Sequence, residues 1–159
     1  CGDADFLVYQ YPKFTNAAFG NGSDLVWATV NVAQNVFAVR GENNAVKIYK
    51  NLQESSAFSV SFGIEAIFGG RLLAIKGKEF ITFYDWETQV LVRRIDVSPA
   101  PKNVFWSENG QQVVLALEDN FYLLNFDSDQ VVNYISSKEP SDLADKVEDE
   151  DDDGCEEAF

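Results

Sequence analysis

Short apolar runs alternate with polar, turn-forming residues along the chain as far as about residue 135. The runs are rich in β-branched and aromatic side chains and are bounded by Gly, Asn or Asp, which is typical of β-strands. No window of about 11 residues before Pro140 has a helical period. The pattern predicts an all-β body of short antiparallel strands. The predicted strands are Phe6–Tyr11, Leu25–Val30, Val36–Val39, Ala45–Lys50, Ala57–Phe62, Arg71–Ile75, Phe80–Trp86, Val90–Val97, Val104–Trp106, Val113–Leu117, Phe121–Phe126 and Val131–Ile135.

Glycine and asparagine mark the predicted turns between these strands. The sequence GENN at Gly41–Asn44 and the pair Asn109-Gly110 both indicate hairpins. The pair Gly69-Gly70 is followed by neither Lys-Ser/Thr nor a helix, which argues against phosphate binding. We therefore interpret Gly69-Gly70 as a tight approach of two backbone segments or a bend.

The strands repeat as a unit at intervals of about 35 to 40 residues. The repeated units are Leu25–Val60, Glu65–Val97 and Lys102–Ile135, each with four predicted strands when Ile67–Phe68 is counted as the first strand of the second unit. Asp85-Trp86 ends the third strand of the second unit, where WD repeats carry their dipeptide, although in reversed order. The fold class predicted is a partial WD-repeat β-propeller of about three four-stranded blades, with Phe6–Tyr11 as one strand of another. Such an open arc leads us to expect either a fragment of a longer protein or self-association of copies.

Charge separates the propeller from the end of the chain. The 159 residues include 12 Lys and Arg and 26 Asp and Glu, a net charge of −14, and 11 of the acids lie in residues 139–159. We predict a partial propeller over residues 1–135 and an acidic linker over residues 136–159. Acidity on this scale argues against binding nucleic acid or docking directly on an anionic bilayer. The sequence also lacks a run of about 18 apolar residues and a signal-peptide pattern.

Residue types restrict the chemistry further. The chain has no histidine, which excludes Ser-His-Asp and Cys-His nucleophile systems and HExxH zinc sites. Its two cysteines, Cys1 and Cys155, are interpreted as free thiols of a cytosolic protein. A carboxylate pair could be drawn only from residues beside turns, so we predict no enzyme and assign no catalytic, cofactor-binding or metal-ligating residue. These carboxylates are Glu65, Asp85, Glu118 and Asp119.

Three motifs have a functional and a structural interpretation. The sequence Asp149-x-Asp151-x-Asp153-Gly154 resembles the opening of a Ca²⁺-binding loop, but we interpret it as a solvated acidic linker. Asp85-Trp86 could lie on a peptide-binding rim, or Trp86 could fill the space between blades while Asp85 stabilises a turn. Arg93 and Arg94 lie on opposite faces of a strand, where one is expected to cover apolar surface and the other to form a salt bridge or a partner contact.

Three segments together resemble a known family. They are FGGRLLAIKGKEFITFYDWETQVLVRRIDV (68–97), FWSENGQQVVLALEDNFYLLNF (105–126) and DGCEEAF (153–159). Their combination is similar to the second WD-repeat propeller of the β′-COP family of the COPI coatomer, where that propeller joins a helical solenoid. The resemblance is close from Phe62 to Phe126 and looser before Val60.

This resemblance implies a non-enzymatic coat subunit for Golgi-to-ER retrograde and intra-Golgi transport. The implied partners are other coatomer subunits, α-COP above all, and the implied location is the cytoplasm and, through the coat, the surface of Golgi and COPI vesicle membranes. In that family the first propeller reads two-lysine retrieval signals, so no cargo-binding residue is assigned here. The alternative is a peptide-recognition module for basic cargo or adaptor tails.

Overall fold

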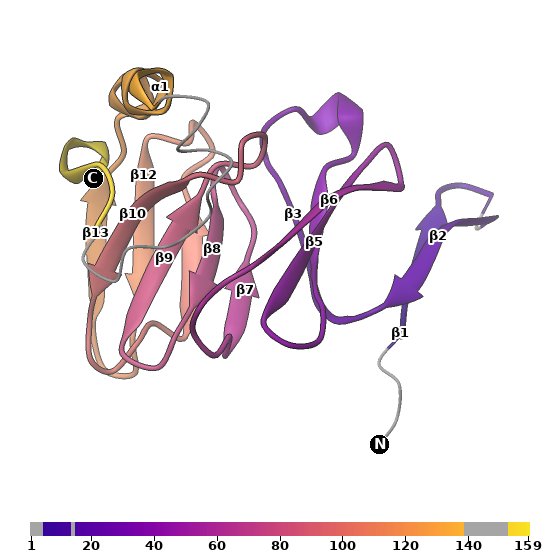
Figure 1. Ribbon diagram of the computed structural model, residues 1–159, viewed down its shortest axis with the longest axis horizontal. Coiled ribbons are helices and arrows are strands. Elements are labelled where there is room, and N and C mark those ends of the chain that lie inside the picture. Colours follow the sequence, from indigo (N-terminus) through magenta and orange to yellow (C-terminus); the bar gives the residue numbers. More distant parts are fainter. Residues whose placement is uncertain (1–4, 14, 139–152) are drawn as a thin grey trace.

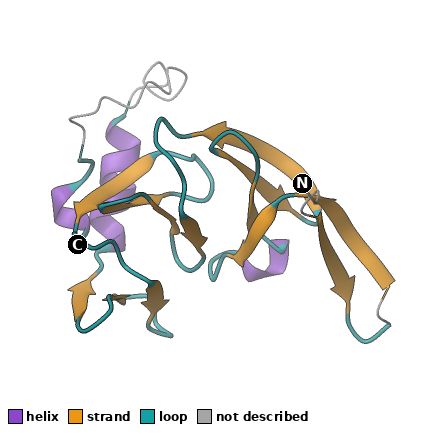
Figure 2. Cartoon of the chain, turned by 90° about the horizontal axis from the view of Figure 1, so that it is seen from below, coloured by secondary structure: helices purple, strands orange, loops and turns teal. Residues whose placement is uncertain are grey.

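Four antiparallel sheets form the body of the protein in a computed structural model that describes residues 5–13, 15–138 and 153–159. The sheets follow one another in chain order, from β1 and β2 at one side to β12 and β13 at the other (Figure 1). The view from below shows the N-terminal hairpin at one end and the helices near the C-terminus at the other (Figure 2). This succession of small sheets confirms the predicted partial β-propeller.

Blades 1 and 2, as we call the sheets β3–β6 and β7–β10, each have four strands. Each strand pairs with the strand before it in the sequence, as expected of a propeller blade. Their strands are β3 (Ser23–Trp27), β4 (Phe37–Arg40), β5 (Ala45–Lys50), β6 (Gln53–Ser59), β7 (Ala66–Phe68), β8 (Leu73–Lys76), β9 (Phe80–Tyr84) and β10 (Leu91–Asp96), with the 3-10 turn η1 (Val32–Gln34) between β3 and β4.

A two-stranded sheet of β1 (Asp5–Gln10) and β2 (Thr15–Asn21) precedes blade 1. This fragment of a further blade contains one strand more than the sequence predicted. The sequence of β2, TNAAFGN, contains no Val, Ile, Tyr or Trp, so strand propensity gave little signal there. Its partner β1 determines the outcome, because Leu7 and Phe19 are directly paired across the hairpin.

Blade 3 has three strands among the described residues: β11 (Asn103–Trp106), β12 (Gln112–Ala116) and β13 (Phe121–Asn125). The strand predicted at Val131–Ile135 is wrong, because these residues belong to helix α1 (Ser128–Ser137). The Asp127 carboxylate caps this helix by accepting hydrogen bonds from the backbone N–H of Asp129 (2.9 Å) and Gln130 (3.3 Å). Val131 and Ile135, four residues apart, then pack into the same core.

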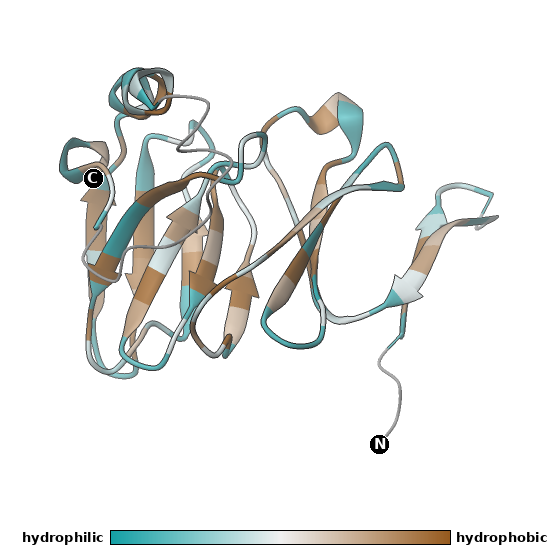
Figure 3. Cartoon of the chain, in the orientation of Figure 1, coloured by the Kyte–Doolittle hydropathy of each residue, from teal (hydrophilic) through white to brown (hydrophobic). Residues whose placement is uncertain are grey.

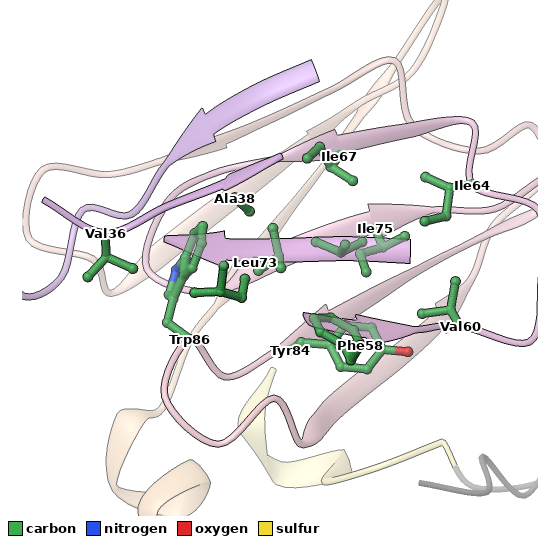
Figure 4. Close-up of a cluster of buried hydrophobic side chains, with 12 residues drawn as sticks. Val36, Ala38, Phe58, Val60, Ile64, Ile67, Leu73, Ile75, Tyr84 and Trp86 are labelled. Carbon is green, nitrogen blue, oxygen red and sulfur yellow. The ribbon is translucent and has the colours of Figure 1, made fainter. Parts of the chain in front are cut away.

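Apolar side chains alternate between the two faces of each blade. Leu73 and Ile75 of blade 2 pack toward blade 1, whereas Leu72 and Ala74 pack toward blade 3. This explains why runs such as LLAI (72–75) are apolar throughout, since both faces are covered (Figure 3). The blade 1–2 core consists of Val36, Ala38, Val46, Ile48, Phe58, Val60, Ile64, Ile67, Leu73, Ile75, Tyr84 and Trp86 (Figure 4). The blade 2–3 core consists of Leu72, Ala74, Ile81, Phe83, Val92, Val104, Val113, Leu115, Phe126, Val131 and Ala158.

The helices are short. Besides α1, the described residues contain the 3-10 turns η1 and η2 (Glu156–Ala158). None of the helices in the described ranges has the length and apolar character that a membrane crossing requires.

Candidate functional site

Trp86 lies where the sequence analysis placed it, between blades 1 and 2. Its side chain is 2% exposed and packs in the blade 1–2 core (Figure 4). Its indole N–H donates a hydrogen bond to the carbonyl oxygen of Gly70 (3.0 Å), which satisfies the polar atom of a buried aromatic residue. The interpretation of Trp86 as a residue that fills the space between blades is confirmed.

Gly69 and Gly70 allow blade 2 to approach Trp27 of blade 1 and Trp106 of blade 3 closely. A Cβ on Gly69 would overlap the carbonyl oxygen of Trp27, and a Cβ on Gly70 would overlap the Trp106 indole. The Gly70 backbone N–H donates to the carbonyl of Trp27 (3.1 Å), and its carbonyl accepts from the backbone N–H of Thr29 (2.9 Å). The predicted close backbone approach is confirmed, and it connects blade 1 to blade 2.

Asp85 stabilises the turn between β9 and β10, as predicted. Its carboxylate accepts hydrogen bonds from the backbone N–H of Glu87 (3.1 Å) and Thr88 (2.8 Å) and from the Thr88 hydroxyl (2.8 Å). A carboxylate that accepts bonds from the next turn of backbone is an ordinary turn-forming interaction. The other predicted hairpin turns are also present, with Asn43 and Asn44 both at positive φ and Gly110 at φ 68°.

The four candidate carboxylates are distributed over three different connections. Glu65 precedes β7 and forms an ion pair with Lys76 (3.5 Å), whereas Asp85 is used in its turn. Glu118 and Asp119 lie in the turn between β12 and β13, where Glu118 pairs with Lys102 (2.9 Å). Within the described ranges no group of three or more His, Cys, Asp or Glu side chains gathers to hold a metal ion.

Arg94 has two interactions on the surface of blade 2. Its Nε donates to a carboxylate oxygen of Asp96 (3.0 Å), and its guanidinium lies 4.0 Å from the centroid of the Phe80 ring. The predicted salt bridge is confirmed for Arg94. On the other face, Nη1 of Arg93 is buried and has no hydrogen-bond partner in the described part of the chain.

The last residues of the chain complete the blade 2–3 core, a role that sequence reasoning missed. The carbonyl of Asp153 accepts from the backbone N–H of Arg94 (2.8 Å), and the Cys155 N–H donates to the carbonyl of Val92 (2.6 Å). Residues 153–155 thus extend the edge of blade 2, with Gly154 bridged to Arg93. We call Asp153–Phe159 the C-terminal clasp.

The clasp ends in two apolar side chains. Ala158 is fully buried, and the Phe159 ring lies 4.8 Å from that of Phe83 and 5.3 Å from that of Phe126, measured between centroids. Gly154 has φ 81°, and a Cβ there would overlap the carbonyl oxygen of Val92. Asp153 and Gly154, which belong to the sequence that resembles the opening of a Ca²⁺-binding loop, are therefore used in strand pairing. The rest of that motif, Asp149 and Asp151, lies outside the described residues, as does most of the predicted linker.

An open recess of about 770 Å³ lies beside the clasp. It is lined by amide and carboxylate side chains together with Arg71, whose guanidinium lies 5.4 Å from the Phe126 ring centroid. Three of its lining residues, Asp127, Asp129 and Glu157, carry carboxylates. The recess is therefore suited to polar and cationic groups.

Two ionisable side chains have shifted pKa values. Burial raises the pKa of Tyr49, and the neighbouring Glu54 carboxylate (3.3 Å) raises it further. The hydrogen bond from Lys102, followed by the charge of that ammonium, lowers the pKa of Glu118. Neither group lies in a catalytic arrangement, since Tyr49 is stacked on Phe37 and Glu118 is on an exposed turn.

Comparisons with known proteins give one consistent result. The family model described as the COPA/B second beta-propeller matches residues 1–159. The coatomer subunit beta′ of Drosophila melanogaster is 39% identical over 159 residues, which are 100% of this chain and 16% of that protein. The probable coatomer subunit beta′ of Schizosaccharomyces pombe is 39% identical over 137 residues, 86% of this chain and 17% of that protein. The Rattus norvegicus coatomer subunit beta′ is 37% identical over 132 residues, which are 83% of this chain and 14% of that protein. The chain thus spans about one sixth of the length of these relatives.

Proposed function

The chain belongs to the COPA/B second β-propeller family, and from this premise we propose that it is a non-enzymatic structural part of the COPI vesicle coat. The transport steps concerned are Golgi-to-ER retrograde and intra-Golgi transport. The observation that carries the proposal is the match of the whole chain to a coatomer subunit beta′. Within the proposal, the protein acts in the cytoplasm and, through the coat, at Golgi and COPI vesicle membranes.

The side chains considered as functional candidates have structural roles, which supports a scaffold. Asp85, Glu65 and Arg94 each have a local structural partner, and Trp86 is buried in the blade 1–2 core. Blades buried on both faces resist bending, because their side chains interdigitate at the density of a protein interior. A rigid stack of blades is suited to holding neighbouring subunits at fixed positions.

Other coatomer subunits are the partners of this scaffold, and α-COP is the first of them. Within the proposal, residues 1–135 are the propeller part, and residues 136–159 lead toward a helical solenoid. The clasp fastens that segment to blade 2 through Arg94 and Val92.

Affinity purification of the tagged full-length protein from cytosol, followed by quantitative mass spectrometry, tests this proposal. The expected result is recovery of the other coatomer subunits near one-to-one, with α-COP retained at the highest salt. The tag alone is the control. Recovery of the protein without stoichiometric coat subunits would contradict the proposal.

The acidic recess favours a second candidate, a peptide-recognition module for basic cargo or adaptor tails. Asp127, Asp129 and Glu157 line it, and carboxylates attract Lys and Arg side chains in a salt-dependent way. Titration with a Lys-rich peptide and with its Lys-to-Gln counterpart distinguishes the two candidates. A peptide-recognition module should bind the Lys-rich peptide selectively, and this binding should weaken as the salt concentration rises. A scaffold requires no such binding.

A further inference from the structure

Two Asn-Gly pairs occur in the chain, at Asn21-Gly22 and at Asn109-Gly110. In such a pair the backbone nitrogen of the glycine can attack the side-chain carbonyl carbon, Cγ, of the asparagine, because glycine has no Cβ to hinder the approach. The attack converts the amide into an acid without an enzyme. The two pairs have the same local sequence chemistry and very different surroundings, so the structure predicts a different reactivity for each.

Hydrogen bonds hold Asn109-Gly110 in the turn between β11 and β12. The Asn109 Oδ1 accepts from the Gln111 backbone N–H (3.1 Å), as in an Asx turn, and from the Ser107 hydroxyl (2.7 Å). The Asn109 Nδ2 donates to Oε1 of Gln111 (3.1 Å). The Gly110 N–H, which would be the nucleophile, donates to the Ser107 carbonyl (2.9 Å). The nitrogen must lose its proton and the side chain must turn toward it, so all these bonds oppose the reaction.

Asn21-Gly22 lies between the β1–β2 hairpin and blade 1, and its reacting groups are unrestrained. Asn21 is the last residue of β2 and is exposed, and Gly22 is partly exposed. Within the described ranges, neither the Asn21 amide nor the Gly22 N–H has a hydrogen-bond partner. Both residues line an open recess of about 400 Å³, so water reaches the pair. The nucleophile and the group that it attacks are therefore free to meet.

We propose that Asn21 is a site of spontaneous deamidation and that Asn109 is protected from this reaction. The Gly22 nitrogen loses its proton and bonds to Cγ of Asn21 while the Cγ–Nδ2 bond breaks, so ammonia leaves and a cyclic succinimide remains. Water then opens the ring. Hydrolysis at Cγ gives aspartate, whereas hydrolysis at the main-chain carbonyl gives isoaspartate. Water is consumed, ammonia is released, and nothing is oxidised or reduced.

The reaction changes both the charge and the backbone at this junction. It places a carboxylate in the recess that Arg40 and Lys47 also line, beside the ion pair of Arg40 with Asp24 (3.2 Å). Isoaspartate also adds a methylene to the main chain between β2 and β3. A Cβ on Gly22 would already overlap the Val39 side chain, so this junction has no room for an added group. Deamidation of Asn21 is thus an ageing reaction that loosens the hairpin from blade 1.

Incubation of the full-length protein at mildly alkaline pH, followed by peptide mapping with mass spectrometry, compares the two sites in one sample. In the folded protein Asn21 should convert at least about tenfold faster than Asn109, because the hydrogen bonds at Asn109 must break first. A methyltransferase specific for isoaspartate, supplied with labelled S-adenosylmethionine, should label the peptide that contains residue 21. The same chain in urea is the control, because both pairs should react at similar rates once the fold is lost.

Three variants locate the cause. Asn21→Gln should abolish the labelling, because attack on the longer side chain requires a larger ring. Ser107→Ala removes a hydroxyl that holds Asn109, so it should speed the conversion of Asn109 in the folded protein and leave the rate at Asn21 unchanged. Ser55→Ala, a change of an exposed serine in β6, is the matched control and should alter neither rate.

Four results would overturn the proposal. They are equal rates at the two sites in the folded protein, a difference that persists in urea, no conversion of Asn21 in the folded protein, and a Ser107→Ala variant in which Asn109 converts as slowly as in the wild type.

Discussion

The two cores on either side of blade 2 are built from different parts. The blade 1–2 core is formed by residues of strands and their connections, and Trp86 is its largest side chain. The blade 2–3 core, by contrast, also requires Val131 from α1 and Ala158 from the clasp. The repeated strands are sufficient to close a core between two four-stranded blades. Beside the third blade, which has three strands among the described residues, residues outside the repeat contribute to the core.

Removal of Trp86 breaks the blade 1–2 core and has the largest expected effect. Trp86→Ala deletes a fully packed indole and leaves the Gly70 carbonyl without its donor, so we expect a loss of about 3–5 kcal/mol in the free energy of unfolding. Urea unfolding followed by circular dichroism measures it. Phe105→Ala is the control, because Phe105 is exposed and should cost less than about 1 kcal/mol. Similar losses in both variants would mean that Trp86 does not hold this core.

Removal of Phe159 breaks the blade 2–3 core through the clasp. Phe159 is only partly buried, so Phe159→Ala should cost about 2 kcal/mol, less than Trp86→Ala. Hydrogen exchange should show faster opening of β10 and α1 and unchanged protection of β4 and β5. Glu156→Ala, an exposed change in the same segment, is the control. Uniform acceleration in all blades would contradict a separate role for the clasp.

Glu118 lies on the surface of blade 3, away from both cores, and replacing it should have the smallest effect on stability. The Lys102 ammonium lowers the pKa of Glu118 in the folded protein. The pair therefore stabilises the fold above the unfolded-state pKa, and this contribution is lost as the pH falls through the folded-state value.

Glu118→Gln should flatten the acid limb of the curve of stability against pH slightly, and high salt should reduce the difference from the wild type. Urea midpoints between neutral pH and about pH 3 measure the effect. Glu108→Gln is the control, because Glu108 forms no ion pair in the described part of the chain. Identical pH curves for wild type and Glu118→Gln would show that the Lys102 pair contributes nothing.

Sequence reasoning succeeded where local pattern and blade structure agree. The strands around Asp85-Trp86, the turns at Gly41–Asn44 and Asn109-Gly110, and the close approach at Gly69-Gly70 all follow from local chemistry. The strand predicted at Val131–Ile135 was wrong because its β-branched residues favour strands. Asp127 as a helix cap and the four-residue spacing of Val131 and Ile135 favour the helix that is present.

The clasp could not be predicted from local pattern. Its apolar residues follow a strongly acidic segment, and the partners that bury them, Phe83 and Phe126, are distant in sequence. The family resemblance of the segment DGCEEAF was the one sequence signal that singled out these residues.

The clasp also sets an order of events during synthesis. Folding follows the emerging chain from its N-terminal side, so blades 1 and 2 can close their shared core once β10 has left the ribosome. The core beside blade 3 waits for Ala158 and Phe159. Until then the apolar side chains of Phe83 and Phe126 lack these partners and are open to water and to chaperones that bind nascent chains.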